Sequence, residues 1–306
     1  MKNFKYVLPV LICIFALSIN MNKAISKTKT EKDAQQDVEV IEMSELSDLV
    51  NLFKKLGYTS EAWAAGDREI PRITFDKVNE GWKTSSSHIP VKLKKQVFFR
   101  VMAPLVLIAN ENILKEREDI KNLALNDKTL HYIAKKYHLI NNIDHEINEE
   151  MRQQLLSMVD VLPPSLVLAQ AAEESGWGTS RFTSEGNAFF GQWDFSGNGM
   201  VPKHQRKELG NYGLARFVSP LASVEGYLFN INTHKAYQKL RKLRASIRKE
   251  KRKLTGIELA STLDKYSERG QAYIDGIISM IKYNNLQHVD DAYLSSKHLI
   301  KLINKA

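Results

Sequence analysis

Two adjacent glutamates followed by a Gly-Trp-Gly turn are the residues best suited to chemistry in this sequence. Residues 169–178 read AQAAEESGWG, which places Glu173 and Glu174 at the end of a strong helix former, with Trp177 close behind. A carboxyl group at a helix C-terminus faces the negative end of the helix dipole and is repelled by a charged neighbour, and both effects raise its pKa. A carboxylic acid that stays protonated near neutral pH beside an aromatic wall is the general acid that glycosidic cleavage requires. The same residues also suit an exposed acidic pair with Trp177 as a core anchor.

The flanking residues predict the helix that would hold this pair. Pro163 and Pro164 suit a first helical turn, residues 165–174 contain no breaker, and Gly176 suits the C-terminus. Residues 186–213 are rich in glycine and polar side chains and predict a lobe of loops with one small hairpin. Further helices are expected over residues 219–232, 235–252, 256–266 and 271–285. The expected fold class is α+β, mostly helical, with a small β/loop lobe.

The part of the chain before this helix is expected to be a helical N-terminal region. Apolar residues recur at helical spacing from Glu45 onwards. Residues 91–118 resemble a buried helix interrupted at Pro104, and Arg100 breaks the apolar stretch, which argues against a membrane span. We expect this region to be a scaffold behind the chemical site, the alternative being a regulatory or partner-docking role.

The first 26 residues resemble an export signal. Lys2 and Lys5 precede an apolar run over residues 6–19, and Ala24 and Ser26 offer a small-x-small cleavage site. The run is shorter than the ~20 residues that cross a bilayer as a helix. We therefore predict export to the periplasm or cell envelope. An uncleaved anchor in the inner membrane, with membrane proximity through the N-terminus, is the alternative.

The composition and the missing motifs restrict the kinds of partner and cofactor that we expect. The 306 residues include 44 Lys and Arg against 35 Asp and Glu, and the net charge of +9 favours an anionic partner. Cys13 is the single cysteine, which excludes a disulfide framework and cysteine-based metal sites. The sequence has no HExxH, GxxxxGK[ST] or GxSxG motif, so no metal and no cofactor are expected. The basic run 235–253 has an apolar stripe at Leu240 and Ile247, typical of a solvated amphipathic helix, and no nucleic-acid partner is expected.

Six ordered blocks of sequence resemble one enzyme family. They are ESGWGTSRF (174–182), EGNAFFGQW (185–193), ARFVSPLASVEGY (215–227), NINTHKAYQKLRKLRA (230–245), YSERGQAYI (266–274) and MIKYNNL (280–286). They are similar to the glucosaminidase domain of glycoside hydrolase family 73, the peptidoglycan hydrolases, and within it to the bacterial Bax group. The N-terminal part is also similar, in IPRITF (70–75) and PLVLIANENIL (104–114). The resemblance therefore spans about residues 45–290 and implies a lysozyme-like catalytic domain.

The resemblance implies roles for individual residues. The family's general acid is the glutamate before Ser-Gly-Trp-Gly, which is Glu174 here, whereas Glu173 stands where the family need not be acidic. Tyr273 matches a cleft tyrosine expected to contact the reacting sugar. The residues expected to bind substrate are Trp177 in the turn, Asn187, Phe190 and Gly191 on the cleft floor, and Trp193 and Tyr212 as sugar platforms in the lobe.

The sequence does not decide which residue supplies the second catalytic carboxylate. The family places it in the β lobe, where Glu208 is the candidate and Asp194 the alternative. A distant base would activate water and invert the anomeric centre, and without one the 2-acetamido group of the substrate would act as nucleophile. The sequence does not choose between these mechanisms.

The function implied by the resemblance is that of an exported endo-β-N-acetylglucosaminidase, which cleaves β-1,4 bonds of peptidoglycan glycan strands after N-acetylglucosamine. The alternatives are a muramidase or lytic transglycosylase, and a cell-wall-binding or morphology protein without activity. The oligomeric state and the physiological partner are not predicted. The expected parts are a signal peptide (1–26), a linker (27–44), the helical region (45–150), the catalytic domain (151–290) and a C-terminal tail (291–306).

Overall fold

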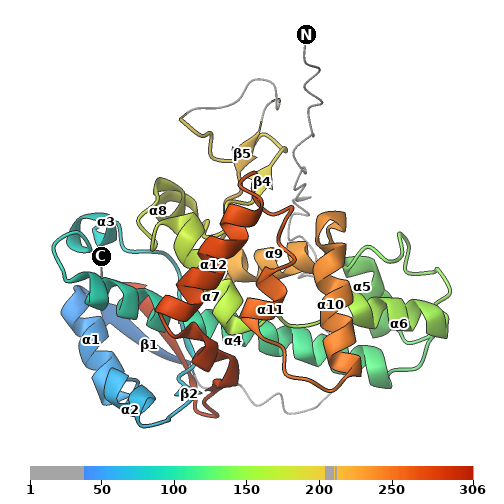
Figure 1. The fold of residues 1–306 in the computed structure, drawn as a ribbon, viewed down its shortest axis with the longest axis horizontal. Coiled ribbons are helices and arrows are strands. Elements are labelled where there is room, and N and C mark those ends of the chain that lie inside the picture. Colours follow the sequence, from blue (N-terminus) through green and yellow to red (C-terminus); the bar gives the residue numbers. More distant parts are fainter. Residues whose placement is uncertain (1–37, 204–209, 211, 306) are drawn as a thin grey trace.

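A long helix runs through the centre of the computed structural model, which describes residues 38–203, 210 and 212–305 (Figure 1). This helix, α4 (Val91–Asn122), continues through Pro104, where the sequence predicts an interruption. Residues 102–107 are all buried, so packing outweighs the hydrogen bond that the proline cannot make. Within the described chain, α4 is the one helix long and apolar enough to cross a membrane. Of its most apolar window, 56% is buried inside the protein, which is typical of a core helix.

The helix α7 (Pro164–Ser175) packs across α4 and is also contacted by α11 (Gly256–Ala260), α12 (Gln271–Tyr283) and η3 (Leu286–Asp291). Every residue from Pro164 to Ala172 is buried, which explains the nearly continuous apolar run. Asp290 of η3 fixes the start of the helix, because its carboxylate accepts hydrogen bonds from the Ser165 N–H and hydroxyl, each 2.8 Å long. A Cβ on Gly256 would lie only 2.1 Å from Ser165 Oγ, so α11 approaches closely where it has no side chain.

Shorter helices surround these two. Several begin at a side chain that accepts a hydrogen bond from the first turn, such as Asn148 before α6 and Ser219 before α9. The remaining helices are α1 (Leu46–Lys55), α2 (Ser60–Ala64), α3 (Trp82–Ser85), α5 (Lys128–Lys136), α6 (Glu149–Met158), α8 (Arg181–Gly186), α9 (Pro220–Thr233), η2 (Lys235–Tyr237) and α10 (Gln238–Lys249).

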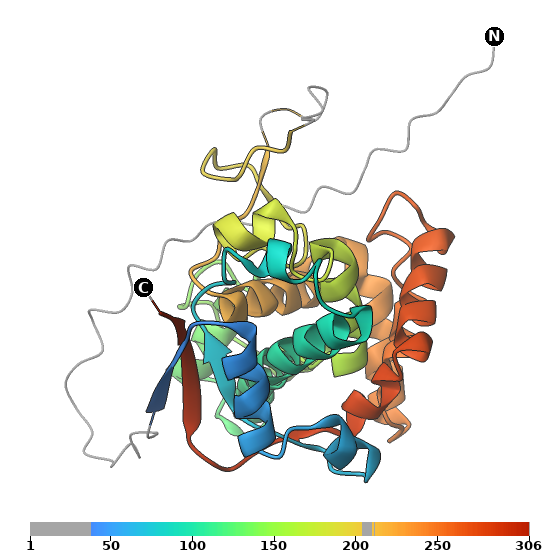
Figure 2. The ribbon, with the colours of Figure 1, turned by 90° about the vertical axis from the view of Figure 1, so that its left-hand side faces the viewer.

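A three-stranded parallel sheet joins the two ends of the described chain (Figure 2). Its middle strand is β7 (Leu299–Asn304), between β1 (Val38–Met43) and β3 (Ile73–Phe75). A second parallel pair joins β2 (Glu69–Ile70) to β6 (Tyr293–Leu294). The sequence predicts a linker over 27–44 and a tail over 291–306, and the structure places strands in both stretches. Ile300 and Leu302 alternate along β7 and are buried, so this terminal strand has a core face.

A small lobe of loops rises beyond one end of α12 (Figure 1). Its hairpin pairs β4 (Trp193–Asp194) with β5 (Gly213–Leu214) in antiparallel fashion. The backbones of Gly199 and Gly213 approach so closely that a Cβ on Gly213 would lie 2.7 Å from the carbonyl carbon of Gly199. The prediction of a mostly helical α+β fold with a small β/loop lobe is confirmed.

The basic helix α10 contains a buried cation. Leu240 and Ile247 face the core, as the amphipathic pattern predicts, but Arg244 is also only 1% exposed. Its guanidinium donates hydrogen bonds of 2.8 Å to the carbonyls of Met158 and Asp160 and to Asn232 Oδ1. Part of the basic run therefore holds together the connection between α6 and α7.

Candidate active site

The turn that ends α7 has an unusual backbone. Gly176, Trp177 and Gly178 have φ angles of +57°, +63° and +75°, all in the left-handed region. Glycine adopts this conformation freely, whereas a residue with a Cβ loses about 1–2 kcal/mol. The Trp177 N–H donates to the Ala172 carbonyl at 3.0 Å, and the Gly178 N–H donates to Ser175 Oγ at 2.9 Å. The Gly-Trp-Gly sequence thus fixes how the helix stops just after Glu174.

The side chain of Trp177 anchors this turn to α4. Its ring meets Phe98 and Phe99 edge-on, with centroids 5.6 and 5.2 Å away, and Lys95 Nζ lies 5.0 Å from the ring centroid. The Trp82 indole N–H donates to the Trp177 carbonyl at 3.0 Å. These contacts stabilise the left-handed backbone of Trp177. They favour the core-anchor role over the expected stacking on a sugar.

Glu174 lies in the last turn of α7 with one carboxyl oxygen fixed. Tyr273 of α12 donates a hydrogen bond from its hydroxyl to Glu174 Oε1 at 2.8 Å. Within the described chain no hydrogen bond reaches Oε2, and a Cβ added to Gly191 would lie 3.7 Å from it. Burial raises the pKa of Glu174, and the hydrogen bond from Tyr273 opposes this rise. The carboxyl group therefore keeps its proton to higher pH than an ordinary glutamate does.

Aromatic rings supply this burial. They belong to Phe190, Tyr227, Tyr237, Tyr266 and Tyr273, with Phe190 stacked on Tyr227 at 4.2 Å and Tyr266 stacked on Tyr273 at 5.2 Å. Tyr273 is only 1% exposed, and burial raises its pKa together with those of Tyr227 and Tyr266. Their hydroxyl groups therefore stay protonated at neutral pH. The sequence suggests Trp177 as the aromatic wall, whereas the structure builds it from tyrosines.

Glu173 is held at the surface by a cation. Its carboxylate accepts a hydrogen bond from Arg269 Nη2 at 2.7 Å, and the Arg269 guanidinium also lies 5.1 Å from the Tyr273 ring centroid. The charge of Glu173 raises the pKa of Glu174, while the charge of Arg269 lowers it. The charges of Glu173 and Arg269 therefore act against each other on the half-buried acid, and Glu173 is engaged outside the site.

The three residues expected on the cleft floor have different surroundings. Asn187 ends α8 with a φ of +52°, and its Nδ2 donates to the carbonyls of Asp76 and Phe217 at 3.2 and 3.1 Å. Phe190 is 3% exposed and belongs to the aromatic cluster. Of the three residues, Gly191 is the one whose backbone faces the Glu174 carboxyl group. Asn187 and Phe190 support the floor from within.

The structure describes some of the predicted lobe residues. Trp193 and Tyr212 stack on each other with centroids 4.8 Å apart. Asp194 is 8% exposed and accepts a hydrogen bond from the Ser196 N–H at 2.7 Å. Glu208 lies outside the described residues, as does the predicted signal peptide. In the described chain no group of three or more His, Cys, Asp or Glu side chains could hold a metal ion.

The sequence analysis missed the wall residues Tyr237 and Tyr266 and two members of a hydrogen-bond chain, Gln170 and Tyr227. Gln170 Nε2 donates to the Tyr273 hydroxyl at 3.0 Å, and the Tyr227 hydroxyl donates to Gln170 Oε1. Gln170 stands one helical turn before Glu174, on the same face of α7. A lone amide in an otherwise apolar run was the available signal.

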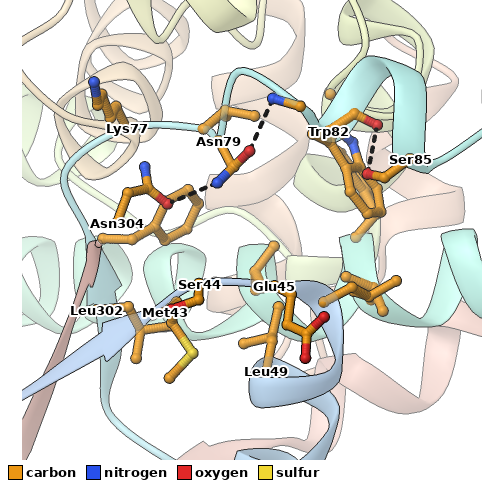
Figure 3. A pocket seen from close by; sticks show the side chains of 18 of the residues that line it. Met43, Ser44, Glu45, Leu49, Lys77, Asn79, Trp82, Ser85, Leu302 and Asn304 are labelled. Atoms are coloured by element: carbon orange, nitrogen blue, oxygen red, sulfur yellow. Dashed lines mark hydrogen bonds between the residues drawn. The ribbon is translucent and has the colours of Figure 1, made fainter. Parts of the chain in front are cut away.

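An apolar pocket of about 320 Å³ reaches the Gly-Trp-Gly turn at Gly178, and Figure 3 shows side chains that line it. Its walls come from the end of β1, α1, α4 and β7, and it reaches Gly178, Trp82 and Phe98. Glu174 does not line it. The pocket therefore adjoins the residues that anchor Trp177 and is separate from the carboxyl group.

Comparison with known proteins places this geometry in a family. The glucosaminidase family model, described as mannosyl-glycoprotein endo-beta-N-acetylglucosaminidase, matches residues 149–286, a span that includes Glu174, Gly191 and Tyr273. The chain is also similar to Protein bax of Escherichia coli (strain K12), with 30% identity over 198 residues, which cover 62% of this chain and 70% of that protein. No solved structure matches the chain.

The family match and the half-buried acid at the end of α7 together define a glucosaminidase-domain protein. More narrowly, the chain belongs to the Bax group of this family, as the sequence blocks predict.

Proposed function

We propose that the protein is an exported peptidoglycan hydrolase, an endo-β-N-acetylglucosaminidase that uses Glu174 as its general acid. The observation that carries this proposal is that the two oxygens of the Glu174 carboxyl group have different surroundings. Tyr273 holds Oε1 at 2.8 Å, while Oε2 faces Gly191, which has no side chain to block a sugar. Burial raises the pKa of Glu174 and thereby favours the protonated form that a general acid needs.

In the proposed reaction Glu174 delivers its proton from Oε2 to the glycosidic oxygen while the bond from C1 to that oxygen breaks. The leaving sugar departs with a neutral hydroxyl group, and positive charge develops at C1 and the ring oxygen. Tyr273 stabilises the new carboxylate through the hydrogen bond it already makes, so no rearrangement is needed when the charge appears. Tyr273 acts on the acid, since its buried hydroxyl is engaged with Glu174 and Gln170.

Two routes are proposed for the second half of the reaction, in which a nucleophile attacks C1. Glu208, or Asp194 in its place, would remove a proton from a water molecule that attacks C1 and inverts the centre. In the other route the acetamido oxygen of the substrate attacks C1, and water later opens the resulting ring. Asp194 is largely buried and bonded to a backbone N–H, so its geometry favours Glu208 or the substrate-assisted route.

The rest of the proposal concerns substrate and location. The stacked Trp193 and Tyr212 are proposed as a sugar platform in the lobe. The net charge of +9 suits the carboxylate-rich glycan strands of the wall, chiefly by speeding encounter. Such a substrate places the protein in the periplasm or cell envelope, with the N-terminus as signal or anchor. Residues 45–150 are proposed as the scaffold of a catalytic domain over 151–290.

The test is product analysis with matched variants. Purified protein is incubated with peptidoglycan, and the fragments are reduced with borohydride and identified by mass spectrometry. Reduced N-acetylglucosamine ends support the proposal. Reduced N-acetylmuramic acid ends or anhydro ends would mean a muramidase or lytic transglycosylase, and no fragments would mean a binding protein.

Glu174→Gln is expected to lose at least about a hundredfold in rate, as for removal of a general acid. Glu173→Gln, its neighbour on the surface, is the control and is expected to stay within a few-fold of wild type. Equal losses of hydrolysis rate in both variants would contradict the role of Glu174 as the general acid.

A further inference from the structure

A chain of hydrogen bonds runs from Glu174 into the core, and we propose that its inner members, Gln170 and Tyr227, are positioning residues. They decide which oxygen of Glu174 carries the acidic proton. The consequence for catalysis rests on the proposed function, whereas the hydrogen-bond direction is a property of the protein alone.

The direction of the chain follows from its atoms. An amide nitrogen can only donate and an amide oxygen can only accept. Gln170 Nε2 donates to the Tyr273 hydroxyl at 3.0 Å, so Tyr273 must send its own proton elsewhere. The acceptor is Glu174 Oε1 at 2.8 Å. With Oε1 occupied as an acceptor, the proton of the neutral acid belongs on Oε2, toward Gly191.

The opposite orientation of the Gln170 amide would reverse this outcome. Its oxygen would then face Tyr273, and the Tyr273 hydroxyl would donate to Gln170. Glu174 could pair with Tyr273 only by donating its own proton, which would point into the core and away from any sugar. The orientation of a buried amide therefore separates a useful acid from a misdirected one.

Tyr227 selects the useful orientation. Its hydroxyl donates to Gln170 Oε1, and its side chain is 1% exposed. Turning the amide over would point an N–H at the Tyr227 oxygen, which can accept it, but would leave the buried Tyr227 proton without this acceptor. An unpaired buried donor loses its hydration free energy, which disfavours that state. The stacking of Tyr227 on Phe190 at 4.2 Å keeps the ring in place.

The remaining groups around Glu174 do not supply this selection. The ionisable side chains that face it are Glu173 of α7, Arg269 and Tyr266 in the loop before α12, Tyr273 of α12, Tyr227 of α9 and Tyr237 of η2. Glu173 and Arg269 pair with each other at the surface. Tyr266 donates to the Phe190 carbonyl at 3.3 Å, outside the chain.

The experiment removes single hydroxyl groups and measures the titration of Glu174. Tyr227→Phe keeps the ring and deletes the selecting donor. Tyr137→Phe is the matched control, because it deletes an equally buried hydroxyl that donates to Glu116 at 2.7 Å, away from the site. Gln170→Met is a second test, which keeps the side-chain length and removes both the amide donor and the amide acceptor. Carboxyl carbons of labelled glutamate are followed by NMR, and Glu174→Gln identifies the resonance.

We expect Glu174 to titrate at higher pH in Tyr227→Phe and Gln170→Met than in wild type, because Tyr273 then no longer donates steadily to its anion. The Tyr137→Phe protein should titrate like wild type. In hydrolysis, Tyr227→Phe should lower kcat about tenfold, equivalent to about 1.4 kcal/mol, with KM changed less than about twofold.

A Glu174 titration in Tyr227→Phe that coincides with wild type would overturn the inference. So would an equal shift in Tyr137→Phe, since that would indicate a general effect of a lost buried hydroxyl. A wild-type protein that releases no glycan fragments would instead refute the proposed function, and the NMR titration would still decide the role of the two residues.

Discussion

Replacing Arg244 with methionine tests whether the buried cation of α10 holds the start of the acid helix in place. Methionine keeps most of the volume and removes the guanidinium. Three acceptors lie 2.8 Å from it: the Met158 carbonyl, the Asp160 carbonyl and Asn232 Oδ1. The Asp160 carbonyl keeps a donor, because Asn232 Nδ2 also reaches it at 3.0 Å. At least two acceptors are left unpaired, at about 1–3 kcal/mol each, so we expect a loss of at least about 2 kcal/mol.

Arg248→Met is the matched control, because Arg248 binds the carboxylate of the same residue, Asp160, with two hydrogen bonds of 3.0 Å but has a side chain that is 39% exposed. Water can replace this guanidinium, and the buried carboxylate keeps Arg117 and Arg244 at 3.9 and 4.0 Å, so a loss of about 1 kcal/mol is expected. Urea unfolding followed by circular dichroism and tryptophan fluorescence measures both variants, and the two probes test for a single transition. If Arg244→Met lowers the free energy of unfolding no more than Arg248→Met does, the argument that the buried guanidinium matters more than the exposed one is refuted.

Two further predictions concern α7. Because burial raises the folded-state pKa of Glu174, this group contributes most stability below its unfolded pKa, and the contribution is lost as pH rises through the folded pKa. Glu174→Gln should therefore match wild type near pH 4 and melt at a higher temperature than wild type near pH 8. Calorimetry across this range checks it, and a gap independent of pH would contradict it. Gly256→Ala should cost about 1–3 kcal/mol in a urea titration, because its Cβ would lie 2.7 Å from the Leu166 backbone nitrogen. Gly276→Ala, with no atom within 4 Å, should be neutral or stabilising, and the reverse order would contradict the packing argument.

Local signals in the sequence predicted the acid helix well, because its limits are set by residues next to it. The double proline and Gly176 bracket residues 165–174, and the structure gives α7 as Pro164–Ser175. The strand β7 could not be predicted in this way. Its six residues acquire their secondary structure by pairing with β1 and β3, which lie more than 200 residues earlier in the chain.

The same division holds for the site. The pair Glu173 and Glu174 was found from its position at a helix end, whereas the choice of Glu174 and the role of Tyr273 came from the family resemblance. The role of Trp177 depends on Phe98 and Phe99 in a distant helix, so its own neighbours could not decide between anchor and platform. Gln170 looked like one polar residue in a core helix, because its partners come from α9 and α12.

The central place of β7 has a consequence for biogenesis. Because β7 lies between two strands that are synthesised more than 200 residues earlier, the sheet can close only after residues 299–304 have left the ribosome. Until then the nascent chain lacks the core contacts of Ile300 and Leu302. Premature termination before Leu299 would leave β1 and β3 without the strand that joins them, so incomplete products would be open to proteolysis.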